Sequence, residues 1–237
     1  MLTLNPARGD KSPQAANLWG DRTEDGATGF MVKFVNGFSS PPHIHNVTYR
    51  GVVLAGEVHN DDPDAADMWM PKGSFWTQPA GEVHITSARG TTNIAYIEID
   101  SGPYLVHPAD QAFDRGERPV NVHDTNLVWV QDSNLEWIPQ DLGVEIAFLW
   151  GDPESNSPYG LMIKVPAGFD GAIHHASGPF RAIVVNGSVT HHNQSVLLET
   201  GSYLGSSSVA SGATAFTSDS GAVMYVRAQS EIEILAK

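Results

Sequence analysis

The chain lacks cysteine altogether, and its 237 residues include only 13 Lys and Arg against 27 Asp and Glu, a formal net charge of −14. The absence of cysteine excludes disulfide bonds and thiolate metal ligands. The shortage of positive charge argues against nucleic acid, whose phosphates are bound mainly by Lys and Arg, and against an anionic membrane surface. We therefore expect a small-molecule ligand or substrate as the partner, with no nucleic acid and no membrane.

Long apolar runs are also missing. No segment approaches the roughly eighteen apolar residues that a membrane span needs. Residues 1–10 do not show the charged start and apolar core that are typical of a signal peptide. Hydrophobic residues nevertheless make up 41% of the chain, enough to build a folded core. These features fit a soluble protein of either the cytoplasm or the periplasm, and they do not choose between the two.

The chain contains two copies of one unit. Residues 18–56 match residues 149–187 at 13 of 39 positions, with a constant offset of 131 and no gap. Both copies consist of short apolar runs bounded by Gly, Pro, Asn and Asp, a pattern typical of β-strands. We predict an all-β protein with two tandem jelly-roll (double-stranded β-helix) barrels, one over residues 1–115 and one over residues 116–237. The polar run at residues 60–64 predicts an exposed turn.

Three histidines of the first copy have the spacing of a metal site. His43 and His45 are one residue apart on a predicted strand, so their side chains point to the same face. His84, from a neighbouring strand, could join them. Three neutral imidazoles around one divalent cation leave coordination positions open, unlike the closed ligand set of a structural site.

The surrounding residues resemble the two motifs of the cupin superfamily, G-x5-H-x-H-x3,4-E-x6-G and G-x5-P-x-G-x2-H-x3-N. The second motif is complete from Gly73 to His84, apart from Ala88 at its final asparagine. The first motif, from Gly37 to Gly56, lacks only its glutamate, which is replaced by Tyr49.

The resemblance implies two barrels of the cupin type and metal ligands at His43, His45 and His84. Without the glutamate, the pattern looks like the three-histidine cupins such as acetylacetone dioxygenase. The general run of the chain is also similar to the cupin of zinc-binding anti-sigma factors. The implied cofactor is one divalent metal, and imidazole ligands suit Fe, Zn, Ni or Mn without selecting among them.

Three further residues are candidates for a catalytic role. Tyr49 could be a fourth ligand, a hydrogen-bond donor beside the ligands or a core aromatic; the second copy has Phe180 there. Gln78 could orient a water on the metal or cap a turn. Glu98 lies in an apolar strand and could be a general base or a residue of the solvent-facing side.

The second copy lacks most of these groups. It keeps His174 at the position of His43, but Ala176 replaces His45, and residues 207–214 contain no histidine where the second motif would fall. One imidazole cannot hold a labile divalent metal against water. We therefore expect the second barrel to be metal-free.

Neutral ligands leave the full positive charge on a metal, which favours small anionic ligands that chelate through two oxygens. The first hypothesis is a metal-dependent, dioxygenase-like oxidoreductase, as the resemblance to the three-histidine cupins implies, acting on a small oxygen-chelating substrate. The alternative is a non-catalytic module that binds or senses a metal or a small ligand. A metal-free sugar isomerase or epimerase is a weaker third class, because it would need a His-Asp dyad. Jelly-roll barrels often pair through sheet edges, so the chain could form a homodimer.

Overall fold

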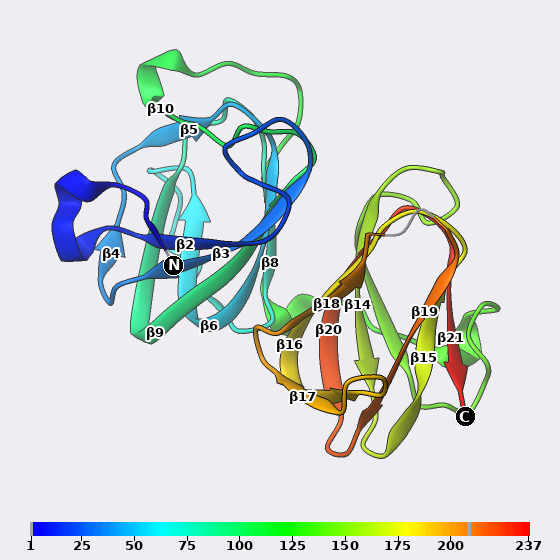
Figure 1. Cartoon of the computed structure of the whole chain (residues 1–237). Coiled ribbons are helices and arrows are strands. Elements are labelled where there is room, and N and C mark those ends of the chain that lie inside the picture. The colour runs from blue at the N-terminus through cyan, green and yellow to red at the C-terminus, as the bar shows by residue number, and fades with distance from the viewer. Residues whose placement is uncertain (1, 208–209) are drawn as a thin grey trace. The chain divides into compact units, whose positions relative to one another are not determined.

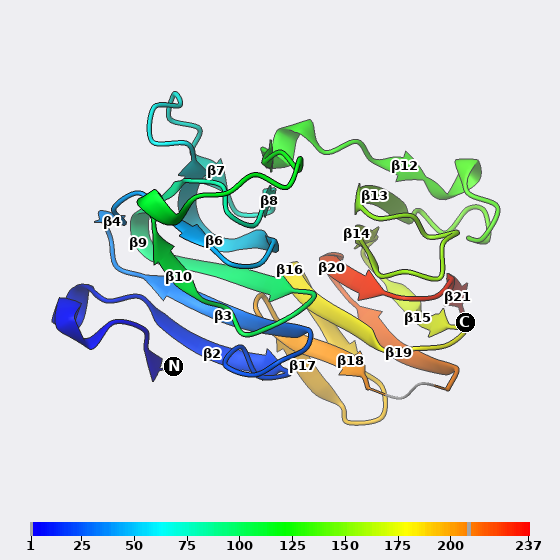
Figure 2. The same ribbon diagram turned by 90° about the horizontal axis from the view of Figure 1, so that it is seen from above.

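The computed structural model describes residues 2–207 and 210–237, so Ser208 and Val209, within the segment expected to replace the second motif, lie outside the described residues. The chain divides into two compact units, unit 1 over Met1–Asn126 and unit 2 over Leu127–Lys237. Both units consist almost entirely of curled antiparallel strands (Figures 1 and 2). This confirms the all-β fold with two tandem barrels.

Unit 1 is built on a sheet in the order β1-β2-β3-β9-β6-β8-β11, to which β4 adds through β9 and β7 through β6. A separate pair joins β5 to β10. The strands are β1 (Leu2–Thr3), β2 (Gln14–Trp19), β3 (Thr28–Phe34), β4 (Phe38–Ser39), β5 (His43–His45), β6 (Tyr49–Asp61), β7 (Met70–Pro71), β8 (Phe75–Gln78), β9 (Ile85–Ile99), β10 (Val106–Pro108) and β11 (Val120–Val122), and the short 3-10 helices are η1 (Pro6–Lys11), η2 (Ala109–Gln111) and η3 (Asp124–Asn126). Because β11 pairs with β8, the chain after residue 115 still contacts unit 1.

Unit 2 repeats this arrangement in the order β12-β13-β14-β20-β16-β19-β15-β21, with β17 and β18 paired to β16. The elements are β12 (Val130–Gln131), η4 (Asp132–Asn134), β13 (Glu145–Trp150), β14 (Tyr159–Val165), β15 (Phe169–His175), β16 (Phe180–His191), β17 (Val196–Glu199), β18 (Tyr203–Ser206), β19 (Gly212–Ser218), β20 (Ala222–Ala228) and β21 (Ile232–Ala236).

The LWGD repeat marks the same packing feature in both units. In unit 1 the indole Nε1 of Trp19 donates to the Tyr96 hydroxyl at 3.1 Å, and the ring lies over Gly29, where an added Cβ would come within 2.2 Å of Nε1. Figure 1 shows the strands involved, β2, β3 and β9, side by side. Only glycine leaves room for the indole here, which explains why the tryptophan and the glycine recur together.

The core of unit 1 lies on the face of the sheet that carries Tyr49, Val53 and Ile97. The expected exposed turn at residues 60–64 is wrong at its first two residues, because β6 continues to Asp61 and still pairs with β9 there. Alternation along this strand turns Asn60 to the core face, where it is buried. Asn60 is therefore available to the interior of the barrel.

Within the described residues, the structure has no helix long and apolar enough to cross a membrane.

Candidate metal centre

His43, His45 and His84 meet at one end of unit 1. His43 and His84 face each other and are joined by two backbone hydrogen bonds of 3.0 Å. His45 is two positions after His43 on β5. Each of the three offers a ring nitrogen, and these nitrogens all lie within 4.8 Å of one another. Among the described residues, this is the one cluster of His, Asp or Glu that could hold a metal ion.

Local backbone geometry explains the convergence. Ile44 is buried on the opposite side of β5, so His43 and His45 share the other face. His84 follows a tight turn in which the amide of Gly81 donates to the His45 carbonyl at 2.8 Å. Gly81 has a φ of +78°, and a Cβ there would approach the Phe113 carbonyl oxygen to 2.4 Å, so the turn requires glycine.

Backbone carbonyls fix the orientation of each ring. In all three histidines Nδ1 lies within hydrogen-bond distance of a carbonyl oxygen, which can only accept, so Nδ1 carries the proton. Nε2 is then unprotonated, and its lone pair is directed away from the carbonyl. Metal-binding histidines are commonly oriented in this way, by a hydrogen bond from the ring nitrogen that does not bind the metal. The three contacts are His43 with Pro41 at 2.9 Å, His45 with Leu105 at 3.0 Å and His84 with Glu82 at 3.1 Å.

The three imidazoles are electrically neutral at pH 7. Burial lowers the pKa of His43, lowers that of His45 well below its usual range and, with the neighbouring imidazole of His43, lowers the pKa of His84 to about 3. Protonation therefore does not compete for the Nε2 lone pairs. Three converging neutral lone pairs in a largely buried site fit a divalent cation that accepts nitrogen ligands.

Two phenol hydroxyls contact Nε2 atoms of the histidine cluster, each at a different histidine. The Tyr49 hydroxyl is 3.2 Å from Nε2 of His84, and it also donates to Oδ1 of Asn60 at 2.8 Å. The Tyr104 hydroxyl is 3.1 Å from Nε2 of His45, and its ring stacks on that imidazole with centroids 4.3 Å apart. Burial raises the pKa of both phenols, so both keep their protons at neutral pH.

A buried amide network supports Tyr49. The Oδ1 atom of Asn60 accepts hydrogen bonds from Tyr49 and from Thr86, each at 2.8 Å, while its Nδ2 atom donates to Oε1 of Gln78 at 2.9 Å. Gln78 is thus brought close to the cluster, but it contacts Asn60 rather than an imidazole. Sequence patterns gave no reason to select Asn60 or Tyr104, since neither falls in a motif.

Glu98 is not brought to the cluster. On β9 its neighbours Ile97 and Ile99 belong to the core face that carries Tyr49, so Glu98 points to the other face of the sheet. It is fully buried there and accepts a hydrogen bond of 3.0 Å from the Tyr96 hydroxyl. This position does not suit a base that acts at the histidines.

Among the described residues, the corresponding end of unit 2 has no cluster of this kind. His174 pairs across β15 and β19 with Ala213, as His43 pairs with His84, and its Nδ1 lies 3.7 Å from a carboxylate oxygen of Glu233. Phe180 pairs with Ser206 where Tyr49 pairs with Gln78. Of the three ligand positions, that of His43 alone keeps a histidine in unit 2, and the imidazole of this His174 lies near a carboxylate.

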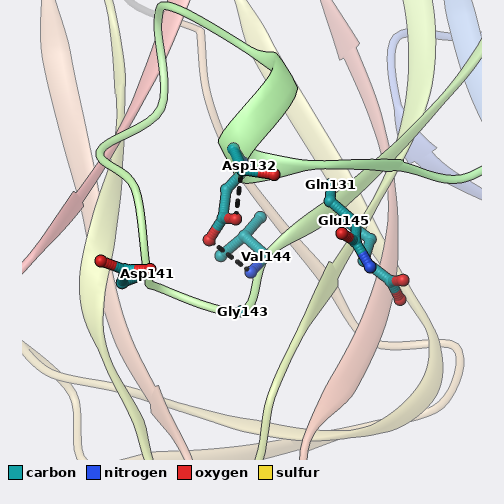
Figure 3. Close-up of a pocket in the computed structure, with 7 residues that line it drawn as sticks. Gln131, Asp132, Asp141, Gly143, Val144 and Glu145 are labelled. Atoms are coloured by element: carbon teal, nitrogen blue, oxygen red, sulfur yellow. Dashed lines mark hydrogen bonds between the residues drawn. The ribbon is translucent and has the colours of Figure 1, made fainter.

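Unit 2 does contain an acidic cavity of about 440 Å³ beside β12 and β13 (Figure 3). The Asp132 carboxylate accepts hydrogen bonds from the backbone amides of Ser133 at 2.7 Å and Val144 at 3.3 Å. Figure 3 shows that Asp132, Asp141 and Glu145 do not point toward a common centre. Asp132 therefore ties two backbone segments together, and the cavity offers no converging ligand set.

Comparison with known proteins places the fold. A family model described as "Domain of unknown function (DUF4437)" matches residues 1–235, and no curated protein sequence matches the chain. Similar solved structures include a proposed dioxygenase from Nostoc punctiforme (15% identity, TM-score 0.68, covering 96% of this chain and 87% of that one). Salicylate 1,2-dioxygenase from Pseudoaminobacter salicylatoxidans, as adducts with gentisate, is 14% identical, with a TM-score of 0.62 and coverage of 93% and 74%. GK1651 from Geobacillus kaustophilus is 13% identical, with a TM-score of 0.58 and coverage of 91% and 88%. At these identities the similarity supports a shared cupin-like fold. It does not extend to activity.

Proposed function

We propose that this chain, which belongs to the family described as Domain of unknown function (DUF4437), is a metal-dependent, dioxygenase-like cupin that acts on a small oxygen-chelating substrate. The observation that carries the proposal is the convergence of His43, His45 and His84, whose ring nitrogens lie within 4.8 Å of one another. The ligand role is proposed for these three residues, with Fe(II) as the metal that fits a dioxygenase.

A bound divalent metal would supply Lewis acidity and open positions for a substrate and for dioxygen. The protein itself supplies three neutral nitrogen ligands held in register by backbone carbonyls. It adds no carboxylate to that set, because Tyr49 stands at the glutamate position of the cupin motif. The undiminished positive charge favours anionic substrates that chelate through two oxygens, such as enolates, 1,3-dicarbonyls, 2-oxo acids or hydroxybenzoates.

The similarity of fold to proteins named as dioxygenases supports this class of reaction. One of them, salicylate 1,2-dioxygenase, forms adducts with gentisate, a hydroxybenzoate whose carboxylate and phenol oxygens can chelate a metal. Gentisate therefore belongs among the compounds to be tested with this chain, although the substrate itself is not indicated by a likeness of 14% identity.

One observation favours a binding module without turnover as the second candidate. Glu98, the carboxylate expected as a base, points away from the histidines, and the groups that do reach them are the protonated phenols of Tyr49 and Tyr104. A sensor needs the metal and the ligand pocket but no base. Binding of a chelating ligand without oxygen consumption would identify this function.

Oxygen uptake separates the two candidates. The protein is loaded with Fe(II) and screened in an oxygen electrode with 1,3-dicarbonyls, 2-oxo acids and hydroxybenzoates. We expect uptake with at least one compound, its loss in His84→Ala and its retention in His174→Ala, which removes the unit 2 histidine at the position of His43. Uptake with none of them, together with saturable binding of one, would replace the enzyme by the binding module.

A further inference from the structure

Tyr104 brings a hydroxyl to the histidine cluster from outside the two cupin motifs. It follows β9, and the chain around it is fastened to β5. Its backbone amide donates to the Arg22 carbonyl at 2.8 Å. The next residue, Leu105, accepts from Nδ1 of His45, and Val106 begins the strand β10 that pairs with β5. The segment is therefore part of the site's framework.

The Tyr104 ring is held on several sides, so its hydroxyl has a defined position. It stacks on His45 at an interplanar angle of 17°, and the rings of Phe30 and Tyr49 contact it edge-on, with centroids at 5.2 Å and 5.6 Å. Rotation of the ring out of this position would break all three contacts. The hydroxyl is consequently fixed beside Nε2 of His45.

The two phenols differ in what they could do once a cation takes the Nε2 lone pairs. Tyr49 keeps an acceptor, because its hydroxyl also donates to Oδ1 of Asn60. Among the described residues, Nε2 of His45 is the one hydrogen-bond partner of the Tyr104 hydroxyl. A cation on that nitrogen would leave the Tyr104 proton without an acceptor, and a desolvated donor without an acceptor is unfavourable.

We infer that Tyr104 determines which ligand the site accepts: its hydroxyl donates a hydrogen bond to an oxygen atom of a small anionic ligand bound beside the three histidines. The inference rests on the proposed metal site and adds the ligand class to it. Carboxylate and enolate oxygens keep lone pairs after chelation and can accept from the phenol. A neutral imidazole ligand uses its one available lone pair on the metal and offers no acceptor to Tyr104.

Cobalt(II) substitution tests the inference without relying on turnover. Cobalt content per chain is measured first, and the protein is then titrated with oxalate and, separately, with imidazole, following the visible spectrum of the metal. In Tyr104→Phe we expect the same cobalt content as in the unsubstituted protein. Oxalate should bind about tenfold or more weakly, the loss expected for one hydrogen bond to a charged oxygen, while imidazole binding changes much less.

The matched control is Tyr159→Phe, which removes a buried phenol hydroxyl of unit 2 that donates to the Ser230 carbonyl at 2.8 Å. It should change neither cobalt content nor oxalate affinity. Equal oxalate affinity in Tyr104→Phe and the unsubstituted protein would overturn the inference. Loss of cobalt from Tyr104→Phe would also overturn it, because the phenol would then help to hold the metal. Absence of cobalt from the unsubstituted protein would instead overturn the proposed metal site, on which the inference depends.

Discussion

Units 1 and 2 share a scaffold but differ at the end where the histidines lie. Trp150 donates to the Tyr225 hydroxyl at 2.9 Å and lies over Gly160, as Trp19 does with Tyr96 and Gly29 in unit 1. The packing that defines the barrel has therefore been kept in both copies.

Apart from His174 at the position of His43, the site residues have not been kept. Where His84 stands across from His43, Ala213 stands across from His174, and Phe180 takes the place of Tyr49. The barrel of unit 2 closes without these groups around an apolar core that includes Phe180. The fold consequently does not require the histidine cluster, and the proposed metal site gives the buried imidazoles of unit 1 a function.

The largest expected effect is the loss of metal from His84→Ala. Removing one of three ligands leaves His43 and His45, which cannot compete with water for a labile divalent ion. We expect about one metal per chain in the unsubstituted protein and close to none in the variant, measured by elemental analysis after purification without a metal-affinity tag. His174→Ala, the matched change in unit 2, should leave the metal content unchanged. If the two variants lost equal amounts of metal, the proposal that unit 1 alone binds it would be wrong.

A second prediction concerns the buried amide network beside the histidines of unit 1. Asn60→Ala removes an acceptor for Tyr49 and Thr86 and the donor to Gln78. Leaving these buried groups unpaired should lower the free energy of unfolding by about 2–4 kcal/mol. Chemical denaturation measures the change. Asn134→Ala, at an exposed asparagine of unit 2, should change it by less than about 0.5 kcal/mol. A similar small change in both variants would mean that the network contributes little.

The pH dependence of the metal-free protein gives a third test. The pKa of His84 is lowered to about 3 in the folded state, whereas an unfolded histidine titrates near 6.5. Between these values the unfolded chain binds a proton that the folded chain does not, so stability falls as the pH falls below 6.5. From pH 6.5 to 5.5 the unsubstituted protein should lose about 1 kcal/mol more than His84→Gln, in parallel urea titrations. A larger loss in His84→Gln would contradict the burial of a neutral imidazole.

The smallest effect is expected for Tyr49→Phe, which gives unit 1 the residue type that unit 2 already has at Phe180. Asn60 keeps its hydrogen bond from Thr86, so the variant should lose about 1 kcal/mol of stability and retain its metal. Thermal denaturation and elemental analysis measure the two quantities together. A fall in metal content would show that the phenol of Tyr49 helps to hold the metal, contrary to the three-histidine site proposed here.

The sequence was enough to predict the scaffold and the cluster, because both leave a recognisable pattern in it: an internal repeat and a motif spacing. The 131-residue repeat predicted two barrels, and the alternation of side chains on a strand predicted that His43 and His45 share a face. His84 was predicted from the resemblance to the second cupin motif, in which Gly81 stands three residues before it. The structure shows why that glycine is needed, through its positive φ and its close approach to the Phe113 carbonyl.

The surroundings of the histidines could not be predicted in this way. Tyr104 reaches His45 from 59 positions away, through a segment with no repeating pattern. Asn60 begins a polar run that predicted an exposed turn. In the structure the pairing of β6 with β9 includes Asn60, and its side chain is buried. The side of the sheet that Glu98 faces depends on strand register, which its own sequence does not fix.

Anomalous diffraction from crystals of the metal-supplemented protein, collected at the absorption edge of the bound metal, tests the central claim most directly. We expect one ion about 2.0–2.2 Å from Nε2 of His43, His45 and His84, and none at His174 in unit 2. An empty cluster with metal in excess, or an ion held in unit 2 instead, would contradict it.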